Sequence, residues 1–175
     1  VHNDSGDLAR VFLIDRAGRT RLVVQLKGIQ SVDAEDIAIA PGAKAGTYDV
    51  CLADIGDNRA TRRTIVIYRF AEVALQGQTA DTVTVDATAY TLRYPDGPTD
   101  AEAFFVHPRT GDGYILTKRL DGRPRLYKLA APWDAKNETT LTPVRTIDLP
   151  PALPPGRIVT AADISPDGRR VAVRC

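Results

Sequence analysis

The feature that most constrains the fold is an acidic segment that recurs at the start of apolar runs. It reads DAEDIA at residues 33–38 and DAEAFF at 100–105, and a degenerate copy, TAADIS, stands at 160–165. The copies are 67 and 60 residues apart, and short strands and turns return between them in the same order. A repeat of about 40–50 residues with four short strands is typical of a propeller blade. The sequence therefore predicts blades that carry long loops.

Turn signals separate the apolar runs along the whole chain. Pro41-Gly42, Asp96-Gly97 and Asp167-Gly168 are examples, and the runs between such pairs are rich in Val, Ile, Leu, Tyr and Thr. These residues favour strands. No segment has the long apolar stripe and the caps of a helix. The predicted fold class is all-β.

The repeat predicts one incomplete β-propeller domain over residues 1–175, with about three blade-equivalents of four antiparallel strands in an open arc. The blades are a partial one at 1–27 (strands 11–15 and 21–26), one at 33–94 (36–40, 48–53, 64–70 and 87–94), one at 100–149 (103–107, 114–117, 125–129 and 141–149), and a partial one at 160–175 (163–165 and 170–174). A propeller needs at least about four blades to close. We therefore expect the remaining blades of the same propeller outside this sequence, and exposed strand edges with poor stability alone.

Composition narrows the class of partner. The net charge is +1 and 43% of the residues are hydrophobic, which indicates a soluble globular protein and no nucleic-acid partner. The longest apolar runs have the length of strands, so no membrane span is expected. The sequence has no Met, so Val1 is not a translation start and we expect a processed or excerpted chain. Cys51 is expected to be buried, and the redox state of Cys51 and Cys175 stays open.

Blade topology predicts where polar groups meet. Because neighbouring strands are antiparallel, the start of the first strand and the end of the second lie on one edge of a blade, near the channel. We call this edge the acidic mouth. Asp4 belongs to the first blade and shares an Asp-x-Gly-Asp spacing with the second. The residues expected at the mouth are Asp4, Asp33, Glu35, Asp36, Asp54, Asp57, Asn58, Asp100, Glu102, Lys118 and Arg119.

Oxygen ligands so close together recruit a cation or raise each other's pKa. Hard ligands of this kind suit Ca²⁺ or Mg²⁺, and the predicted metal ligands are Asp4, Asp33, Glu35, Asp54, Asp57, Asn58 and Glu102. In the third blade Lys118 stands where the second has Asp54, and with Arg119 it could hold an anion such as phosphate against the metal. An alternative stays open for the aspartates, which often cap their own turns. It does not explain Glu35 and Glu102. Lys118 and Arg119 could equally be solvated rim charges.

Catalytic residues are not assigned. The chain has no nucleophile elbow, no phosphate-binding glycine loop and no plausible Ser–His–Asp order. His107 is expected to be structural. Single aromatic residues are scattered through the chain, which indicates packing between blades rather than a platform for stacking sugars. They are Tyr68, Tyr94, Tyr114, Tyr127 and Trp133.

The run Ile164-Ser-Pro-Asp-Gly-Arg-Arg-Val-Ala-Val resembles the inner-strand motif of TolB-type propeller repeats. Together with the two DAE segments and Asp54-Ile-Gly-Asp-Asn, it makes the chain similar to secreted bacterial propellers, distantly related to the phytase-like and gluconolactonase/strictosidine-synthase-like groups. The resemblance covers nearly the whole chain. It implies Ca²⁺ bound by an inner-strand Glu and by Asp or Asn at the channel mouth. The matching positions are Glu35, Glu102, Asp54, Asp57 and Asn58, whereas Lys118 and Ala162 depart from the pattern.

The favoured function is a Ca²⁺-containing propeller that binds a small-molecule or protein ligand at its face. One alternative is a metal-dependent hydrolase of a phosphoester or lactone, with Glu35 or Asp57 as base. Another is a non-catalytic module that docks a protein or a glycan. The resemblance and a composition rich in Arg and Ala imply a bacterial, secreted or cell-envelope location. Substrate, total blade number and oligomeric state stay open.

Overall fold

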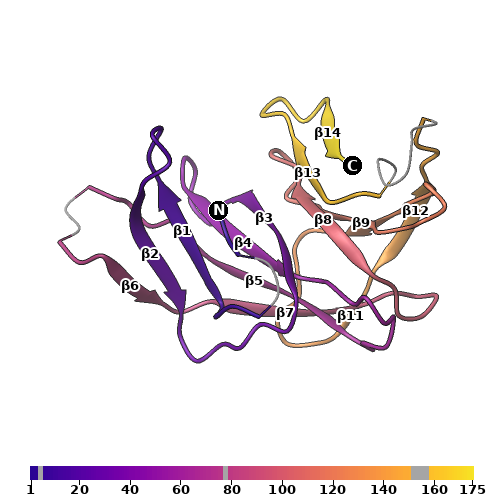
Figure 1. The fold of residues 1–175 in the computed structure, drawn as a ribbon, viewed down its shortest axis with the longest axis horizontal. Helices are drawn as coiled ribbons and strands as arrows, with labels where there is room; N and C mark the ends of the chain where they lie inside the picture. The colour runs from indigo at the N-terminus through magenta and orange to yellow at the C-terminus, as the bar shows by residue number, and fades with distance from the viewer. Residues whose placement is uncertain (4–5, 77–78, 151–157) are drawn as a thin grey trace.

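A computed structural model describes residues 1–3, 6–76, 79–150 and 158–175. These residues form fourteen strands and no α-helix, in four mostly antiparallel sheets that follow one another along the chain (Figure 1). The all-β prediction is confirmed. No helix in the described part is long and apolar enough to cross a membrane.

The second and third sheets are the best-formed parts of the molecule. In each, four antiparallel strands pair in chain order. The second contains β3 (Ala34–Pro41), β4 (Tyr48–Asp54), β5 (Ile65–Ala71) and β7 (Thr88–Arg93). The third contains β8 (Ala101–Val106), β9 (Gly113–Thr117), β10 (Arg125–Leu129) and β12 (Thr142–Thr146). The strand order predicted from the repeat is therefore confirmed here.

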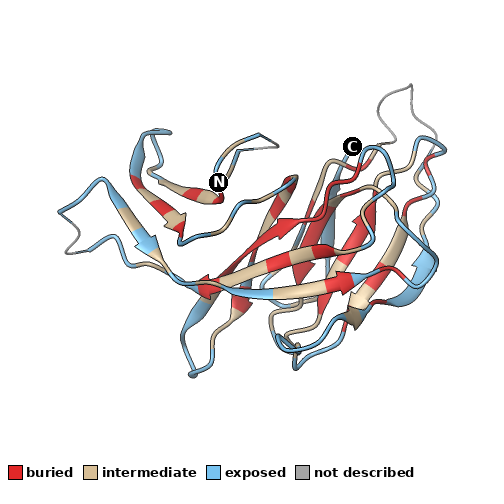
Figure 2. Ribbon diagram, turned by 90° about the horizontal axis from the view of Figure 1, so that it is seen from below, coloured by how far each residue is buried: buried red, intermediate tan, exposed pale blue. Residues whose placement is uncertain are grey.

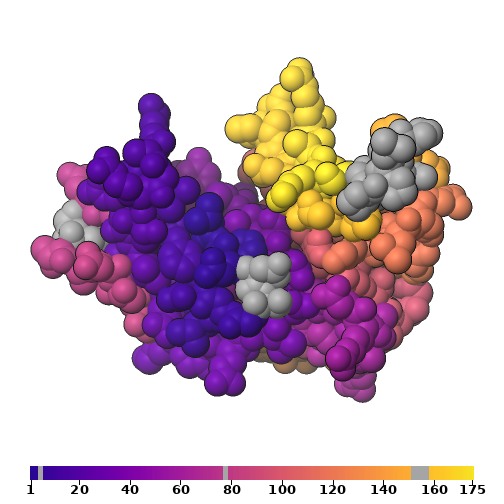
Figure 3. All heavy atoms as spheres, in the orientation of Figure 1, coloured from indigo at the N-terminus to yellow at the C-terminus, as the bar shows by residue number. Residues whose placement is uncertain are grey.

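The outer two sheets contain the predicted partial sets. The first has β1 (Arg10–Ile14) and β2 (Thr20–Leu26), and the last has β13 (Ala161–Ile164) and β14 (Val171–Arg174). None of the four sheets closes on itself. Figure 3 shows the hairpin of β13 and β14 standing above the body of the molecule, and every residue of β14 is exposed.

Two short strands were not predicted, and both join neighbouring sheets. β6 (Thr82–Val85) pairs in parallel with β2, and β11 (Thr139–Thr140) pairs in parallel with β7. In the chain, β6 lies between β5 and β7, and β11 lies between β10 and β12. Each nevertheless pairs with the preceding sheet and extends it. The sequence does not reveal them because a parallel partner in another sheet leaves no local turn signal.

The apolar core lies between sheets rather than within one. One cluster joins the second and third sheets, with Ile67 and Phe104 among its members. A second joins the first and second sheets, and a third joins the third sheet to β13. Figure 2 shows buried residues along the strands and mostly exposed loops. Cys51 is buried as predicted, burial raises the pKa of its thiol to about 12, and both cysteines are free.

The first strands of the last three sheets, β3, β8 and β13, lie side by side, as predicted for β3 and β8. Asp36 connects all three. Its carboxylate accepts backbone N–H hydrogen bonds from Ile37 (2.8 Å), Phe104 (2.8 Å) and Ala162 (3.3 Å). Burial raises the pKa of Asp36 although these donors favour the charged form. The acid is thus a structural link between the three strands, whereas the sequence placed it only among the acids expected at the mouth.

Candidate functional site

Two equivalent corners of neighbouring sheets form the acidic mouth. The second-sheet corner comprises residues 33–36 and 53–58, and the third-sheet corner comprises residues 100–103 and 116–118. The corners touch, since the Asp57 N–H donates to the Asp100 carboxylate at 2.7 Å and Lys118 Nζ donates to Asn58 Oδ1 at 3.4 Å. The structure therefore brings these segments to one edge. Asp4 lies outside the described residues.

Glu35 and Glu102 each occupy a β-bulge. The pairing of β3 with β4 shifts between Ala34 and Asp36, and that of β8 with β9 shifts between Ala101 and Ala103. Each glutamate is therefore the extra residue of its strand. Bulges turn a side chain away from the regular pleat and are frequent beside functional sites. The bulges explain the positions of Glu35 and Glu102, which turn capping did not explain.

Two aspartates of the second-sheet corner, Asp54 and Asp57, hold the loop that follows β4. Asp54 is 1% exposed, and its carboxylate accepts the N–H groups of Val32 (2.8 Å) and Asp33 (2.9 Å) and Nη1 of Arg62 (2.8 Å). Asp57 accepts the N–H groups of Thr61 and Arg62. Turn capping, the alternative left open by the sequence, is confirmed for Asp57.

Lys118 supplies a cation to the third-sheet corner. Its ammonium forms an ion pair with Glu102 and lies 3.7 Å from the Asp100 carboxylate. Partial burial lowers the pKa of Lys118, but Glu102, Asp100 and Glu35 outweigh it, so the pKa lies above its ordinary value. Arg119 pairs instead with Asp121 in the following turn, at 2.7 Å.

Backbone pairing identifies Gly56 as the counterpart of Lys118. The Gly56 N–H donates to the Asp33 carbonyl (3.1 Å), as the Lys118 N–H donates to the Asp100 carbonyl (2.9 Å). The sequence predicted Lys118 as the counterpart of Asp54. In the structure the counterpart of Asp54 is Thr117, because Thr117 pairs with Ala101 in the same way that Asp54 pairs with Ala34.

The space above Gly56 is filled by two carboxylates. A Cβ added to Gly56 would collide with the side chains of Asp33 and Glu35. Two acids thus flank a lysine in one corner and a glycine in the other.

The predicted seven-ligand metal site is not assembled by the described residues. No group of three or more His, Cys, Asp or Glu among them is arranged to hold a metal ion. Asp54 and Asp57 accept backbone N–H groups, and Glu102 pairs with Lys118. Asp33 and Glu35 come together at Gly56. The closeness of these two carboxylates is what a shared cation would require.

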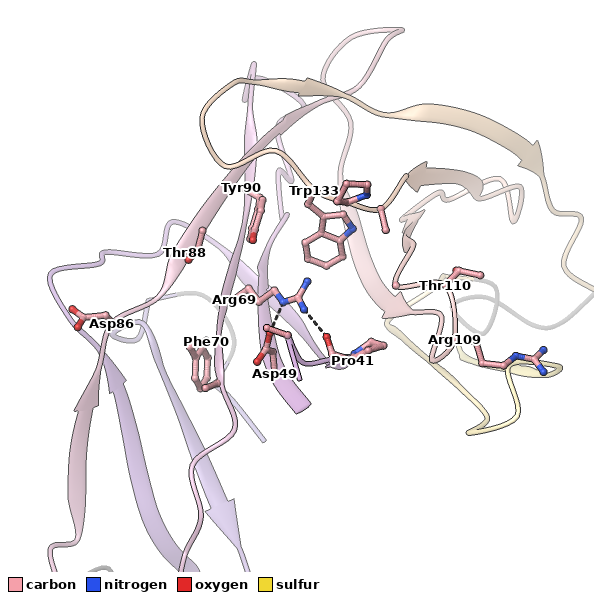
Figure 4. A pocket seen from close by; sticks show the side chains of 15 residues that line it. Pro41, Asp49, Arg69, Phe70, Asp86, Thr88, Tyr90, Arg109, Thr110 and Trp133 are labelled. Atoms are coloured by element: carbon pink, nitrogen blue, oxygen red, sulfur yellow. Dashed lines mark hydrogen bonds and ion pairs between the residues drawn. The ribbon is translucent and has the colours of Figure 1, made fainter. Parts of the chain in front are cut away.

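A cleft at the opposite edge was not foreseen. It lies between the second and third sheets and is lined by Arg69, Tyr90 and Trp133 among others (Figure 4). Trp133 packs edge-on against Tyr90 of one sheet and Phe104 of the other, so its predicted packing role is confirmed. The only tryptophan of the chain was the signal that could have drawn attention to this region.

No family model matches this sequence, and no curated protein sequence matches it significantly.

Proposed function

We propose that this chain forms consecutive blades of a β-propeller, and that its acidic mouth binds a divalent cation together with an anionic ligand. Three observations support the propeller. Four-stranded sheets follow in chain order, the apolar cores lie between neighbouring sheets, and the first strands lie side by side. Such an arrangement is typical of blades around a channel, and this supports the proposal.

The observation that carries the cation proposal is the equivalence of Gly56 and Lys118. In the third-sheet corner, a lysine ammonium lies against the acids on and before the bulge, Glu102 and Asp100. In the second-sheet corner, the matching acids, Glu35 and Asp33, bring their carboxylates together over Gly56. Two carboxylates so close together favour a cation, so a divalent cation bound by both would add to this corner the kind of positive charge that Lys118 adds to the third-sheet corner.

An anionic ligand follows from the number of protein oxygens. Mg²⁺ is commonly held by one or two carboxylates, with water and ligand phosphates supplying the other oxygens, and Ca²⁺ takes 6–8 oxygen ligands. Two carboxylates therefore leave most positions to water and ligand. Lys118, whose pKa is influenced by Glu35, is close enough to contribute a positive charge to an anion bound there.

Thermal unfolding of the 175-residue chain tests the proposal. CaCl₂ should raise the Tm and EDTA should reverse the rise, because only the folded state assembles the carboxylates. A hundredfold excess over Kd corresponds to about 2.7 kcal/mol. Glycerol 2-phosphate should add to the effect only when Ca²⁺ is present.

Glu35→Gln should remove the response to CaCl₂, and Glu72→Gln should keep it, because Glu72 is an exposed glutamate just after β5 and outside the mouth. A Tm that ignores CaCl₂ in the unsubstituted chain would leave the acids with a structural role alone.

A second candidate, a metal-dependent hydrolase of a phosphoester or lactone, is favoured by one observation. Glu35 lies on a bulge beside the proposed cation, where a general base could act. Hydrolysis of p-nitrophenyl phosphate or a γ-lactone that needs Ca²⁺ and disappears in Glu35→Gln would establish it. Binding without turnover would leave the propeller as a binding module.

A further inference from the structure

The cleft in Figure 4 lies at the other end of β3 from the acidic mouth. Pro41, which lines it, is six residues beyond Glu35, a distance of roughly 20 Å along an extended strand. The cleft has a volume of about 560 Å³. Its walls come from β3, β4, β5 and β7 of the second sheet, and from the β8–β9 turn and the loop after β10 of the third.

A fixed arginine–aspartate pair forms the centre of the cleft. Arg69 Nε donates to Asp49 Oδ2 at 2.8 Å, and Arg69 Nη2 donates to the Pro41 carbonyl at 2.6 Å. The guanidinium lies over the ring of Trp133, 5.1 Å from its centroid. Tyr90 braces that ring edge-on, with centroids 5.2 Å apart. The pair is therefore held in place before any ligand arrives.

The pair keeps hydrogen-bonding capacity that is not used inside the described part of the chain. Arg69 Nη1 and Asp49 Oδ1 have no partner there, and both side chains are 21% exposed. The ion pair, which is neutral overall, thus offers one donor and one acceptor to a ligand in the cleft. A ligand rich in hydroxyl groups matches this arrangement, since each hydroxyl can both donate and accept.

Other ligand classes fit less well. An anion would meet Asp49 and Asp86 as well as Arg69 and Arg109, so the lining carries no net positive charge. A flat aromatic ligand would compete with Arg69 for the face of Trp133 that the guanidinium covers. The volume is within the range of small-molecule sites, about 300–1,000 Å³.

We infer that this cleft binds a neutral sugar or short oligosaccharide, with Arg69 and Asp49 each recognising one of its hydroxyls. In this arrangement Arg69 and Asp49 contact the sugar, and the ring of Trp133 keeps its packing role. The exposed Thr88 on the cleft wall adds a hydroxyl to the lining. The inference does not depend on the cation proposed for the acidic mouth.

Calorimetric titration with maltose, cellobiose and N,N′-diacetylchitobiose tests it. At least one should bind in the millimolar range and change the fluorescence of Trp133, which reports on the cleft because the chain has no other tryptophan. trans-1,2-Cyclohexanediol should compete weakly and cyclohexanol should not. EDTA should leave binding unchanged.

Arg69→Met should weaken binding about tenfold or more, because hydrogen bonds to charged groups are lost. Arg123→Met is the matched control, since Arg123 pairs with Asp148 on the surface. Should Arg69→Met fail to fold, Thr88→Val changes only an exposed wall residue and should weaken binding several-fold. Absence of binding by all three disaccharides, equal binding by a folded Arg69→Met, or binding of glucuronate alone would each overturn the inference.

Discussion

The two corners of the acidic mouth share a backbone and differ in charge. Each has a β-bulge at a glutamate. In each, the backbone N–H of Gly56 or Lys118 donates to the carbonyl of the aspartate that stands two residues before that glutamate. At three matched positions the second-sheet corner has Asp36, Asp54 and Gly56, where the third-sheet corner has Ala103, Thr117 and Lys118. The repeat therefore specifies where polar groups converge, and the side chains decide separately how each corner is neutralised.

The largest expected effect is at the second of these positions. Asp54→Ala would leave the Arg62 guanidinium, 15% exposed, without its carboxylate partner, and two backbone N–H groups without their acceptor. We expect a loss of about 3–5 kcal/mol in the free energy of unfolding, measured in urea. Thr117→Ala removes one acceptor, for the Arg125 N–H, and should cost about 1–2 kcal/mol. Equal losses would mean that the corners are not electrostatically different.

Asp36→Ala gives the second sheet the residue of the third. It removes the acceptor from the N–H groups of Ile37, Phe104 and Ala162. We expect the free energy of unfolding to fall by about 3 kcal/mol, an effect reduced by the free energy that burial of the carboxylate costs in the unsubstituted chain. Asp163→Ala is the matched control, because exposed Asp163 accepts only the N–H of Ile164, at 2.8 Å. Its urea midpoint should hardly move. A similar shift in both variants would contradict the linking role of Asp36.

Lys118→Met removes the built-in cation and makes the corners more alike. We expect a loss of about 1 kcal/mol at pH 7, since the ion pair is partly exposed, and a larger rise of Tm with CaCl₂ than in the unsubstituted chain. Lys136→Met, on an exposed loop, should match the unsubstituted chain.

The same variant has a pH signature. The pKa of folded Lys118 lies above its ordinary value of 10.5, so its contribution is complete below 10.5 and is lost as the pH rises through the folded pKa. The gap in Tm between the unsubstituted chain and Lys118→Met should therefore narrow above pH 10.5. A gap independent of pH would show that the ammonium charge is not the cause.

The smallest expected effect concerns the turn beyond the third-sheet corner. The hydrogen bond from Arg119 lowers the pKa of Asp121 to about 2. Its contribution is therefore present above its ordinary pKa of 3.8 and is lost as the pH falls toward 2. Because the pair is exposed, Asp121→Asn should cost less than about 1 kcal/mol at pH 6 and almost nothing in 1 M NaCl. A cost that survives high salt would point to the turn geometry instead.

Much of the candidate mouth could be predicted because its logic is local. An antiparallel pair brings the start of one strand to the end of the next, so Glu35 and Asp57 belong to one corner whatever surrounds them. The bulges could not be predicted, because a one-residue shift in pairing leaves no pattern in a segment as short as DAEDIA. Lys118 was aligned with Asp54 because the second strand of the second sheet was predicted to end at residue 53, one residue before the observed end of β4.

The sequence by itself determined the all-β class, the order of the strands and the edge where the acids gather, because periodicity and turns act over a few residues. Only the tertiary structure decided the rest. Asp36 receives hydrogen bonds from residues 68 and 126 positions away, β6 and β11 join other sheets, and the cleft around Arg69 draws on several separate segments. Such contacts depend on how the sheets pack against one another, and packing between sheets leaves no local period in the sequence.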